Sequence, residues 1–154
     1  MRRITLQKVV VFVGLSLLGM IIAYPFYSDY FDLLKMLYER ASNGKMEFYG
    51  KYFLFPSPIA IILFGLSFGL MLFQVIFIKK RKLFRPLLWL GIFIASTGII
   101  SYFNAHFTMI TCTLCDGKVF RFHFNSIAIA SILSTASVLS MIPNIFVLLF
   151  RKKR

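Results

Sequence analysis

Four long apolar segments without a single charged side chain constrain this chain more than any other feature. They run over residues 9–27, 56–78, 87–105 and 126–150, and none contains Lys, Arg, Asp or Glu. An α-helix rises 1.5 Å per residue, so about 20 residues cross a hydrocarbon layer of about 30 Å. These runs are continuous, whereas the strands of a membrane β-barrel alternate between apolar and polar residues. The sequence therefore predicts an all-α membrane protein, a bundle of four transmembrane helices.

The composition agrees with a membrane protein. Only 15% of the 154 residues are charged and 59% are hydrophobic, whereas soluble domains carry about 25% charged residues. We expect a single integral membrane domain over residues 1–154, with outer loops at about 28–55 and 106–125. No small-x-small cleavage site follows the first apolar segment, so we expect this segment to be a retained helix and not a signal peptide.

The positions of the positive charges predict the orientation of the chain. The net charge is +13, and twelve of the 18 basic residues lie before the first apolar segment, between the second and third, or after the fourth. These twelve are Arg2, Arg3, Lys8, Lys79, Lys80, Arg81, Lys82, Arg85, Arg151, Lys152, Lys153 and Arg154. All five acidic residues lie in the two other loops. Because basic loops stay in the cytoplasm, we expect a multi-pass protein of the cell membrane with both termini cytoplasmic.

The same charges indicate the partners of the basic segments. We expect these segments to contact anionic lipid headgroups at the cytoplasmic face. In a soluble protein a net charge of +13 would suggest nucleic acid. However, no basic patch interleaved with aromatic residues exists outside the three membrane-flanking segments, so we expect no nucleic-acid partner.

The two halves of the chain resemble each other. A shift of 69 residues aligns FLFPS at 53–57 with FHFNS at 122–126, and a shift of 78 aligns IIAY at 21–24 with IISY at 99–102. Each half would then consist of a basic segment, a helix, an outer loop and a second helix. Two interpretations stay open: a tandem duplication of a two-helix unit, or chance similarity among apolar residues.

The two outer loops carry signals for local structure. In the first loop, Ser28 followed by Asp29 and Asp32 is typical of a helix start, because these residues cap the N-terminus and favour its dipole. Residues 46–55 are aromatic and strand-prone. In the second loop, Asp116-Gly117 is a strong β-hairpin turn. We expect a small extracytoplasmic helix and a β-hairpin, extended by a third strand into a cap on the outer face.

The one chemical motif is the Cys-x-x-Cys of Cys112 and Cys115. On the extracytoplasmic side, where disulfides persist, the pair is expected to form a structural disulfide. A redox-active dithiol is the second interpretation. A metal site is the third: it would need His106 and His123 as further ligands, because a tetrahedral zinc site takes four. We expect no metal, no cofactor and no catalytic residue, unless Cys112 and Cys115 are redox-active.

Small residues mark helix faces suited to close packing. Gly65 and Gly69 form a Gly-x-x-x-Gly motif in the second apolar segment, and Ala130, Ser134 and Ser137 form a ridge with Ser140 in the fourth. Such residues let helix backbones approach each other closely. They could pack inside the bundle, or dock another membrane protein or a second copy of the chain. Near the cytoplasmic ends, Gln74 and Asn144 are expected to serve helix packing, and Asn144 to bond the carbonyl that Pro143 leaves free.

These features favour a non-enzymatic membrane protein with an accessory, assembly, sensing or immunity-like role. It would act through its outer loops and helix faces. One alternative is a membrane thiol–disulfide oxidoreductase that uses Cys112 and Cys115. The other is an oligomeric carrier or channel for small solutes. The absence of ionisable residues within the four segments disfavours this last class, since such residues mark ion and proton paths.

Overall fold

The computed structural model describes residues 6–42, 45–49, 55–78, 83–110, 115–116, 119–123 and 128–149. Four helices dominate these residues: α1 (Leu6–Ser42), α2 (Pro58–Phe77), α3 (Phe84–Ile110) and α4 (Ile129–Leu149). Each is long and apolar enough to cross a membrane, as predicted, and four such helices fit a multi-pass membrane protein. The bounds of α2, α3 and α4 differ from the predicted ones by at most five residues.

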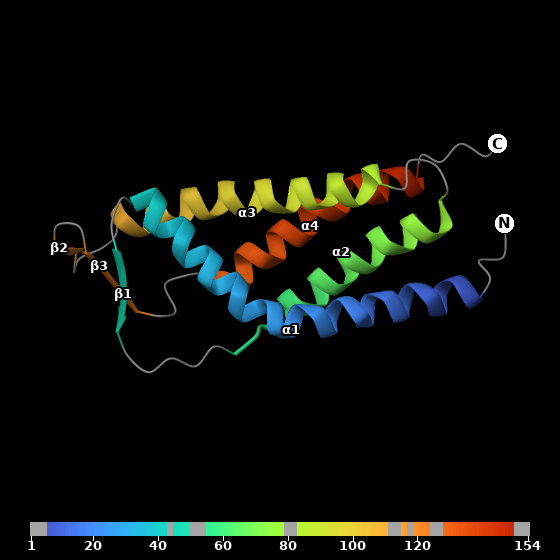
Figure 1. The fold of residues 1–154 in the computed structure, drawn as a ribbon, viewed down its shortest axis with the longest axis horizontal. Coiled ribbons are helices and arrows are strands. Elements are labelled where there is room, and N and C mark those ends of the chain that lie inside the picture. Colours follow the sequence, from blue (N-terminus) through green and yellow to red (C-terminus); the bar gives the residue numbers. More distant parts are fainter. Residues whose placement is uncertain are drawn as a thin grey trace.

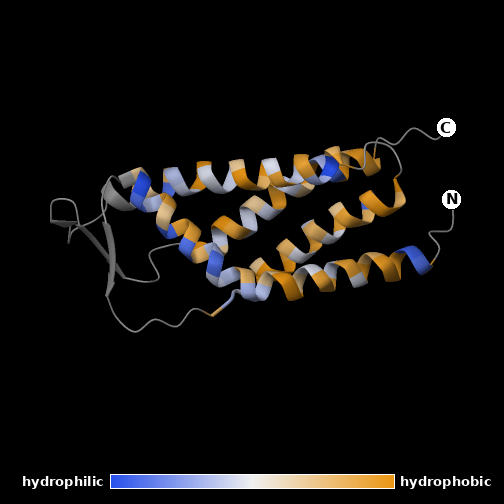
Figure 2. Cartoon of the chain, in the orientation of Figure 1, coloured by the Kyte–Doolittle hydropathy of each residue, from blue (hydrophilic) through white to orange (hydrophobic). Residues whose placement is uncertain are grey.

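The helices alternate in direction. Figure 1 shows α1 and α3 running one way and α2 and α4 the other, so that the start of α1 and the end of α4 lie at the same end of the bundle. Figure 2 shows hydrophobic residues along all four helices, with hydrophilic ones at the start of α1 and along its C-terminal part. Many large apolar side chains point outward, as expected where lipid surrounds a bundle.

Helix α1 corrects the prediction for the first outer loop. The sequence predicted a membrane helix ending at residue 27 and a separate small helix starting at Ser28. In the structure α1 continues from Leu6 to Ser42, a length of 37 residues or about 55 Å. Ser28 and Asp29 are exposed residues within this helix and do not cap a new one. Pro25 lies inside α1, and it removes one backbone hydrogen bond without ending the helix.

The first twenty or so residues of α1 pair with α2 in antiparallel fashion. At one end the Lys8 ammonium lies 5.8 Å from the centre of the Phe77 ring, and at the other the Tyr27 side chain bonds to the Ser57 backbone. Helix α2 has 20 residues, about 30 Å, which matches the hydrocarbon layer. Residues 28–42 of α1 therefore extend past the level at which α2 begins. We call these residues the α1 arm.

The α1 arm packs on α3. Its buried side chains are Tyr30, Leu34 and Tyr38, spaced by four residues along one face of the helix. Its exposed face carries Asp29 and Asp32. Figure 1 shows α1 changing direction before the arm begins, as a helix does at an internal proline such as Pro25. This bend brings the arm from α2 across to α3.

Three short strands lie at the end of the molecule opposite the chain ends (Figure 1): β1 (Lys45–Tyr49), β2 (Cys115–Asp116) and β3 (Val119–His123). The strand order is β1-β3-β2. Strand β1 pairs with β3 in parallel, with Lys45 opposite Val119, and β2 pairs with β3 in antiparallel fashion, with Cys115 opposite Phe120.

Candidate functional site

The Gly-x-x-x-Gly motif of α2 lies against α1, inside the chain. A Cβ atom built on Gly65 would lie 2.4 Å from Met20 Cγ and 2.8 Å from the Ser16 carbonyl oxygen. On Gly69 it would lie 2.4 Å from Ser16 Oγ and 2.8 Å from Ser16 Cα. From the other side, a Cβ on Gly19 would lie 3.0 Å from Gly65 Cα. The backbones of the two helices lie almost in contact, so the surface of the motif is covered by α1.

The small-residue ridge of α4 also faces the interior. Ser137 and Ser140 are buried, and Ala130 is half-buried against the core. Ser137 Oγ donates to the Leu133 carbonyl at 2.7 Å. Ser134 is half-buried and is the least enclosed of the ridge serines. Most of the ridge therefore contacts the other helices of the chain and is not available to a partner.

A polar cluster joins α2, α3 and α4 at the end of the bundle where α1 begins and α4 ends. Gln74 is fully buried, and its Nε2 donates to the Asn144 carbonyl oxygen. Arg85 Nη1 donates to Gln74 Oε1 at 3.1 Å. Both ends of the amide are thus bonded, which a buried amide in lipid requires. We call Gln74, Asn144 and Arg85 the amide cluster.

The hydrogen bond of the Asn144 side chain differs in one detail from the predicted one. Pro143 has no N–H, so within α4 the carbonyl of Leu139 loses its helical donor. The sequence predicted that the Asn144 side chain would bond that carbonyl. In the structure, Asn144 Nδ2 donates to the Ser140 carbonyl at 3.4 Å, one residue further along. The side chain of Asn144 leans back along its own helix, and its backbone carbonyl remains open to Gln74.

A second polar group lies next to the amide cluster and has a defined hydrogen-bond direction. Trp89 Nε1 donates to Ser67 Oγ at 2.7 Å, and Ser140 Oγ donates to the Ser137 carbonyl at 2.8 Å. Ser67 Oγ and Ser140 Oγ are 2.9 Å apart. Because a hydroxyl has one hydrogen and that of Ser140 is already used, Ser67 donates to Ser140. The serine relay of Trp89, Ser67 and Ser140 links three helices.

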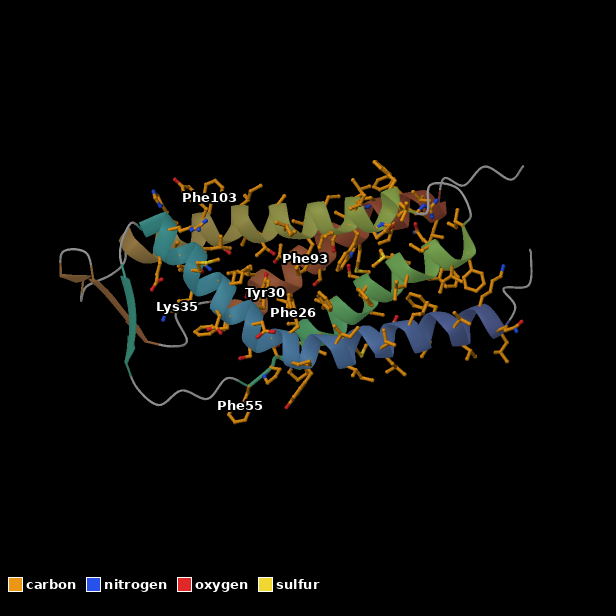
Figure 3. The ribbon with its side chains drawn as sticks, in the orientation of Figure 1. Phe26, Tyr30, Lys35, Phe55, Phe93 and Phe103 are labelled. Atoms are coloured by element: carbon orange, nitrogen blue, oxygen red, sulfur yellow. The ribbon has the colours of Figure 1, made fainter. Side chains whose placement is uncertain are left out.

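Aromatic rings pack together next to the serine relay, on the side toward the start of α2. The Phe64 ring centre lies 5.7 Å from that of Phe93 and 6.0 Å from that of Trp89. Phe26 closes the layer from α1, 5.7 Å from Phe64. Figure 3 shows Phe26, Tyr30 and Phe93 gathered between α1 and α3, whereas Phe55 and Phe103 point away from the bundle. These rings pack against one another between α1, α2 and α3.

Further buried polar side chains lie on the α1 arm and on α3. The hydroxyls of Tyr30 and Thr97 are 3.0 Å apart and form a buried hydrogen bond. Tyr38 Oη and Ser101 Oγ are also buried, and neither has a hydrogen-bond partner within the ranges that the structure describes. Sequence reasoning missed this group, although the four-residue spacing of Tyr30, Leu34 and Tyr38 is a signal for a buried helix face.

The cysteine motif lies mostly outside the described residues. Cys112 belongs to that undescribed part, and Cys115 is placed only by the pairing of β2, so the disulfide stays a prediction. His106 is exposed on α3 and its ring stacks on Tyr102, with centroids 5.0 Å apart. His123 ends β3, opposite Tyr49. Among the described residues, no group of three or more metal-ligating side chains comes together.

Comparison of the whole chain with protein-family models, with curated proteins and with solved structures finds no match in any of the three. Its function must therefore be argued from its own residues.

Proposed function

We propose that the protein is a non-enzymatic membrane protein with an assembly or sensing role, and that it acts through the α1 arm and the neighbouring strands. The observation that carries this proposal is the continuity of α1: one helix pairs with α2 across the membrane layer and then extends as the α1 arm. The polar side chains of the amide cluster and the serine relay bond to one another. They serve to hold the helices together, so the arm is the part best placed to meet a partner.

The orientation belongs to the same proposal. The segments that carry twelve of the 18 basic residues flank the helix ends opposite the α1 arm, which supports a cytoplasmic location for both termini. The arm and the three strands then form an extracytoplasmic cap. In Figure 1 α1 and α3 share one direction and α2 and α4 the other, as a tandem duplication of a two-helix unit would require.

The surface of the α1 arm suits a protein partner better than lipid alone. Leu33 and Met36 are large apolar side chains that are exposed on it, and Asp29 and Asp32 add carboxylates to the same segment. A mixture of apolar and charged side chains is typical of protein–protein interfaces. We infer that the partner is another membrane protein or a second copy of this chain.

Photo-crosslinking would test the proposal in intact membranes. A photoreactive residue at Met36 should give a discrete protein adduct, identified by mass spectrometry, whereas one at Val10 should mainly label lipid. Val10 is the matched control, because it is exposed on the same helix but at the opposite end. The change Leu33→Asp should abolish the adduct at position 36. Lipid labelling alone at position 36, or an adduct that survives Leu33→Asp, would contradict the proposal.

The orientation has its own test. A cysteine at position 36, in a variant that lacks Cys112 and Cys115, should react with a membrane-impermeant maleimide added from outside intact cells. A cysteine at position 7, near the start of α1, should react only after the membrane is opened. The reverse pattern would refute the proposed orientation while leaving the four-helix fold untouched.

A further inference from the structure

Arg85 is the member of the amide cluster that carries a charge. It is half-buried, and its Nη1 donates to Oε1 of the fully buried Gln74 at 3.1 Å. Gln74 in turn donates through Nε2 to the carbonyl oxygen of Asn144 on α4. A guanidinium has five N–H donors in a planar fork, so the same group can bond to an amide and to a phosphate at once. A charge at the surface of the bundle is thereby connected to hydrogen bonds in its interior.

The guanidinium lies close to the edge of the hydrocarbon layer. Helix α2 matches that layer in length, about 30 Å for its 20 residues, and ends at Phe77. Gln74 lies three residues before this end, which is a rise of about 4.5 Å along the helix. Arg85 bonds to Gln74 from the first turn of α3, so it lies at the depth where hydrocarbon gives way to lipid headgroups.

The charges of the chain are distributed unequally between the two ends of the bundle. All five acidic side chains belong to the α1 arm or to strands β1 and β2, at the opposite end: Asp29, Asp32, Glu39, Glu47 and Asp116. Twelve of the 18 basic residues, Arg85 among them, lie at the start of α1, around the connection of α2 to α3, or after α4. A headgroup with its own cation, such as choline, would add a further positive charge here. Electrostatics therefore favour a headgroup with a net negative charge.

We propose that Arg85 binds the phosphate of an anionic phospholipid and thereby makes the stability of the bundle depend on the lipid around it. The phosphate oxygens accept from the guanidinium fork, which the amide oxygen of Gln74 holds in place. Because Gln74 also bonds to α4, a bound headgroup stabilises the contact between α2, α3 and α4. Diffuse attraction of the basic segments to a membrane requires no particular residue, whereas this site requires Arg85. The inference does not depend on the proposed function.

A lipid titration followed by thermal unfolding tests the site. Phosphatidylglycerol added to the purified protein in a neutral detergent should raise the melting temperature by roughly 4–8 °C, because a ligand of the folded state stabilises that state. Phosphatidylcholine with the same acyl chains should raise it by less than half as much, and inorganic phosphate should leave it unchanged. An equal shift with phosphatidylcholine would overturn the preference for a negative headgroup. An equal shift with inorganic phosphate would overturn the lipid as the ligand.

Two variants with the same change in charge separate the Arg85 site from diffuse attraction. Each shift is measured from the melting temperature of that variant without lipid, so a general loss of stability does not enter. Arg85→Gln should remove most of the shift that phosphatidylglycerol causes, whereas Lys8→Gln should keep it. Lys8 is the matched control, because its ammonium lies at the same end of the bundle, 5.8 Å from the centre of the Phe77 ring, and outside the amide cluster. Equal shifts in the two variants would overturn the proposal.

Fluorescence quenching locates the lipid independently of stability. Trp89, the single tryptophan of the chain, lies four residues after Arg85 on α3, about one helical turn further from the start of that helix. Brominated phosphatidylglycerol should quench its emission more than brominated phosphatidylcholine at equal content in the micelle. Arg85→Gln should remove that difference and Lys8→Gln should keep it. Equal quenching by the two lipids in the parent protein would overturn the site.

Discussion

The two ends of the bundle hold their helices together in different ways. At the end where α1 begins and α4 ends, the amide cluster and the serine relay join α2, α3 and α4 through hydrogen bonds between protein groups. At the other end, the α1 arm bonds to α3 through the hydroxyls of Tyr30 and Thr97. Two further buried hydroxyls, one on the arm and one on α3, have no hydrogen-bond partner among the described residues. The polar side chains of the first end bond to one another, whereas the described part of the second end contains buried hydroxyls without such a bond, so we expect its contact to open at a lower cost in free energy.

This difference suits a protein that is anchored at one end and acts at the other. Breaking a hydrogen bond between two groups inside the bundle leaves both groups without a partner, because in lipid there is little water to bond to them instead. A contact that contains hydroxyls without such bonds opens more easily. Four substitutions test this difference between the two ends, and the expected loss of stability decreases from the first to the last.

The largest loss of stability is expected at the close contact of α1 with α2, which lies between the two ends of the bundle. Gly65→Leu places a side chain where even a Cβ atom would lie 2.8 Å from the Ser16 carbonyl oxygen. We expect the free energy of unfolding in detergent to fall by about 3 kcal/mol or more, or folding to fail. Gly91→Leu is the control, because nothing lies within 4 Å of a Cβ at that position. Equal losses in both variants would refute the assigned contact.

The next effect concerns the amide cluster. Gln74→Leu removes the bonds to Asn144 and Arg85 at once and leaves the guanidinium without one of its acceptors. We expect a loss of about 2 kcal/mol in unfolding free energy, measured by denaturant titration in mixed micelles. Thr135→Val is the matched control, since it removes only an exposed hydroxyl that bonds to its own helix at 2.8 Å. If the control were as destabilising as Gln74→Leu, the cluster would not be what fixes this end.

The serine relay should show a smaller effect with an optical signature. Ser67→Ala leaves the Trp89 N–H without its acceptor and interrupts the link to Ser140. We expect a loss of about 1–2 kcal/mol. Trp89 is the single tryptophan of the chain, so its emission reports on this site and should shift to shorter wavelength. An unchanged spectrum would show that Ser67 does not accept from the indole.

The smallest effect is expected at the α1 arm. Tyr30→Phe removes one neutral hydrogen bond to Thr97, and we expect a loss of about 1 kcal/mol. Hydrogen–deuterium exchange should show faster opening of residues 28–42 alone, with the amides of α2 and α4 unchanged. If exchange rose equally throughout the bundle, the two ends would form one cooperative unit and the comparison would fail.

Much of the architecture could be predicted from the sequence, because the lipid environment imposes strong rules. An uncharged apolar run of about 20 residues is stable in a bilayer only as a helix, and the structure has a helix at each of the four runs. The Gly-x-x-x-Gly motif indicated close packing, but its partner was not predictable. Small residues in α1, such as Ser16 and Gly19, show their role only once the two helices are side by side.

The α1 arm was not predictable from local signals. Ser28 and Asp29 favour a helix start, and Pro25 favours a break before it, yet the buried stripe of Tyr30 and Leu34 against α3 keeps the helix continuous. Tertiary packing overrode the local preference for a cap. The hydroxyl pairing of the arm was missed for a similar reason. It depends on which residues of α3 lie level with α1, and a bend inside α1 sets that register.

The bend itself has a mechanical consequence. A helix resists twisting along its whole length, so we expect α1 to rotate about its axis as one unit from Leu6 to Ser42. At Pro25 the helix lacks one backbone hydrogen bond, so we expect it to bend there more easily than elsewhere. Bending at such a point lets the two parts of the helix differ in tilt, while a rotation of one part about the helix axis still turns the other. Rotation of the membrane segment of α1 would therefore turn the arm with it, whereas tilting of that segment in a bilayer of different thickness would leave the arm in its place on α3.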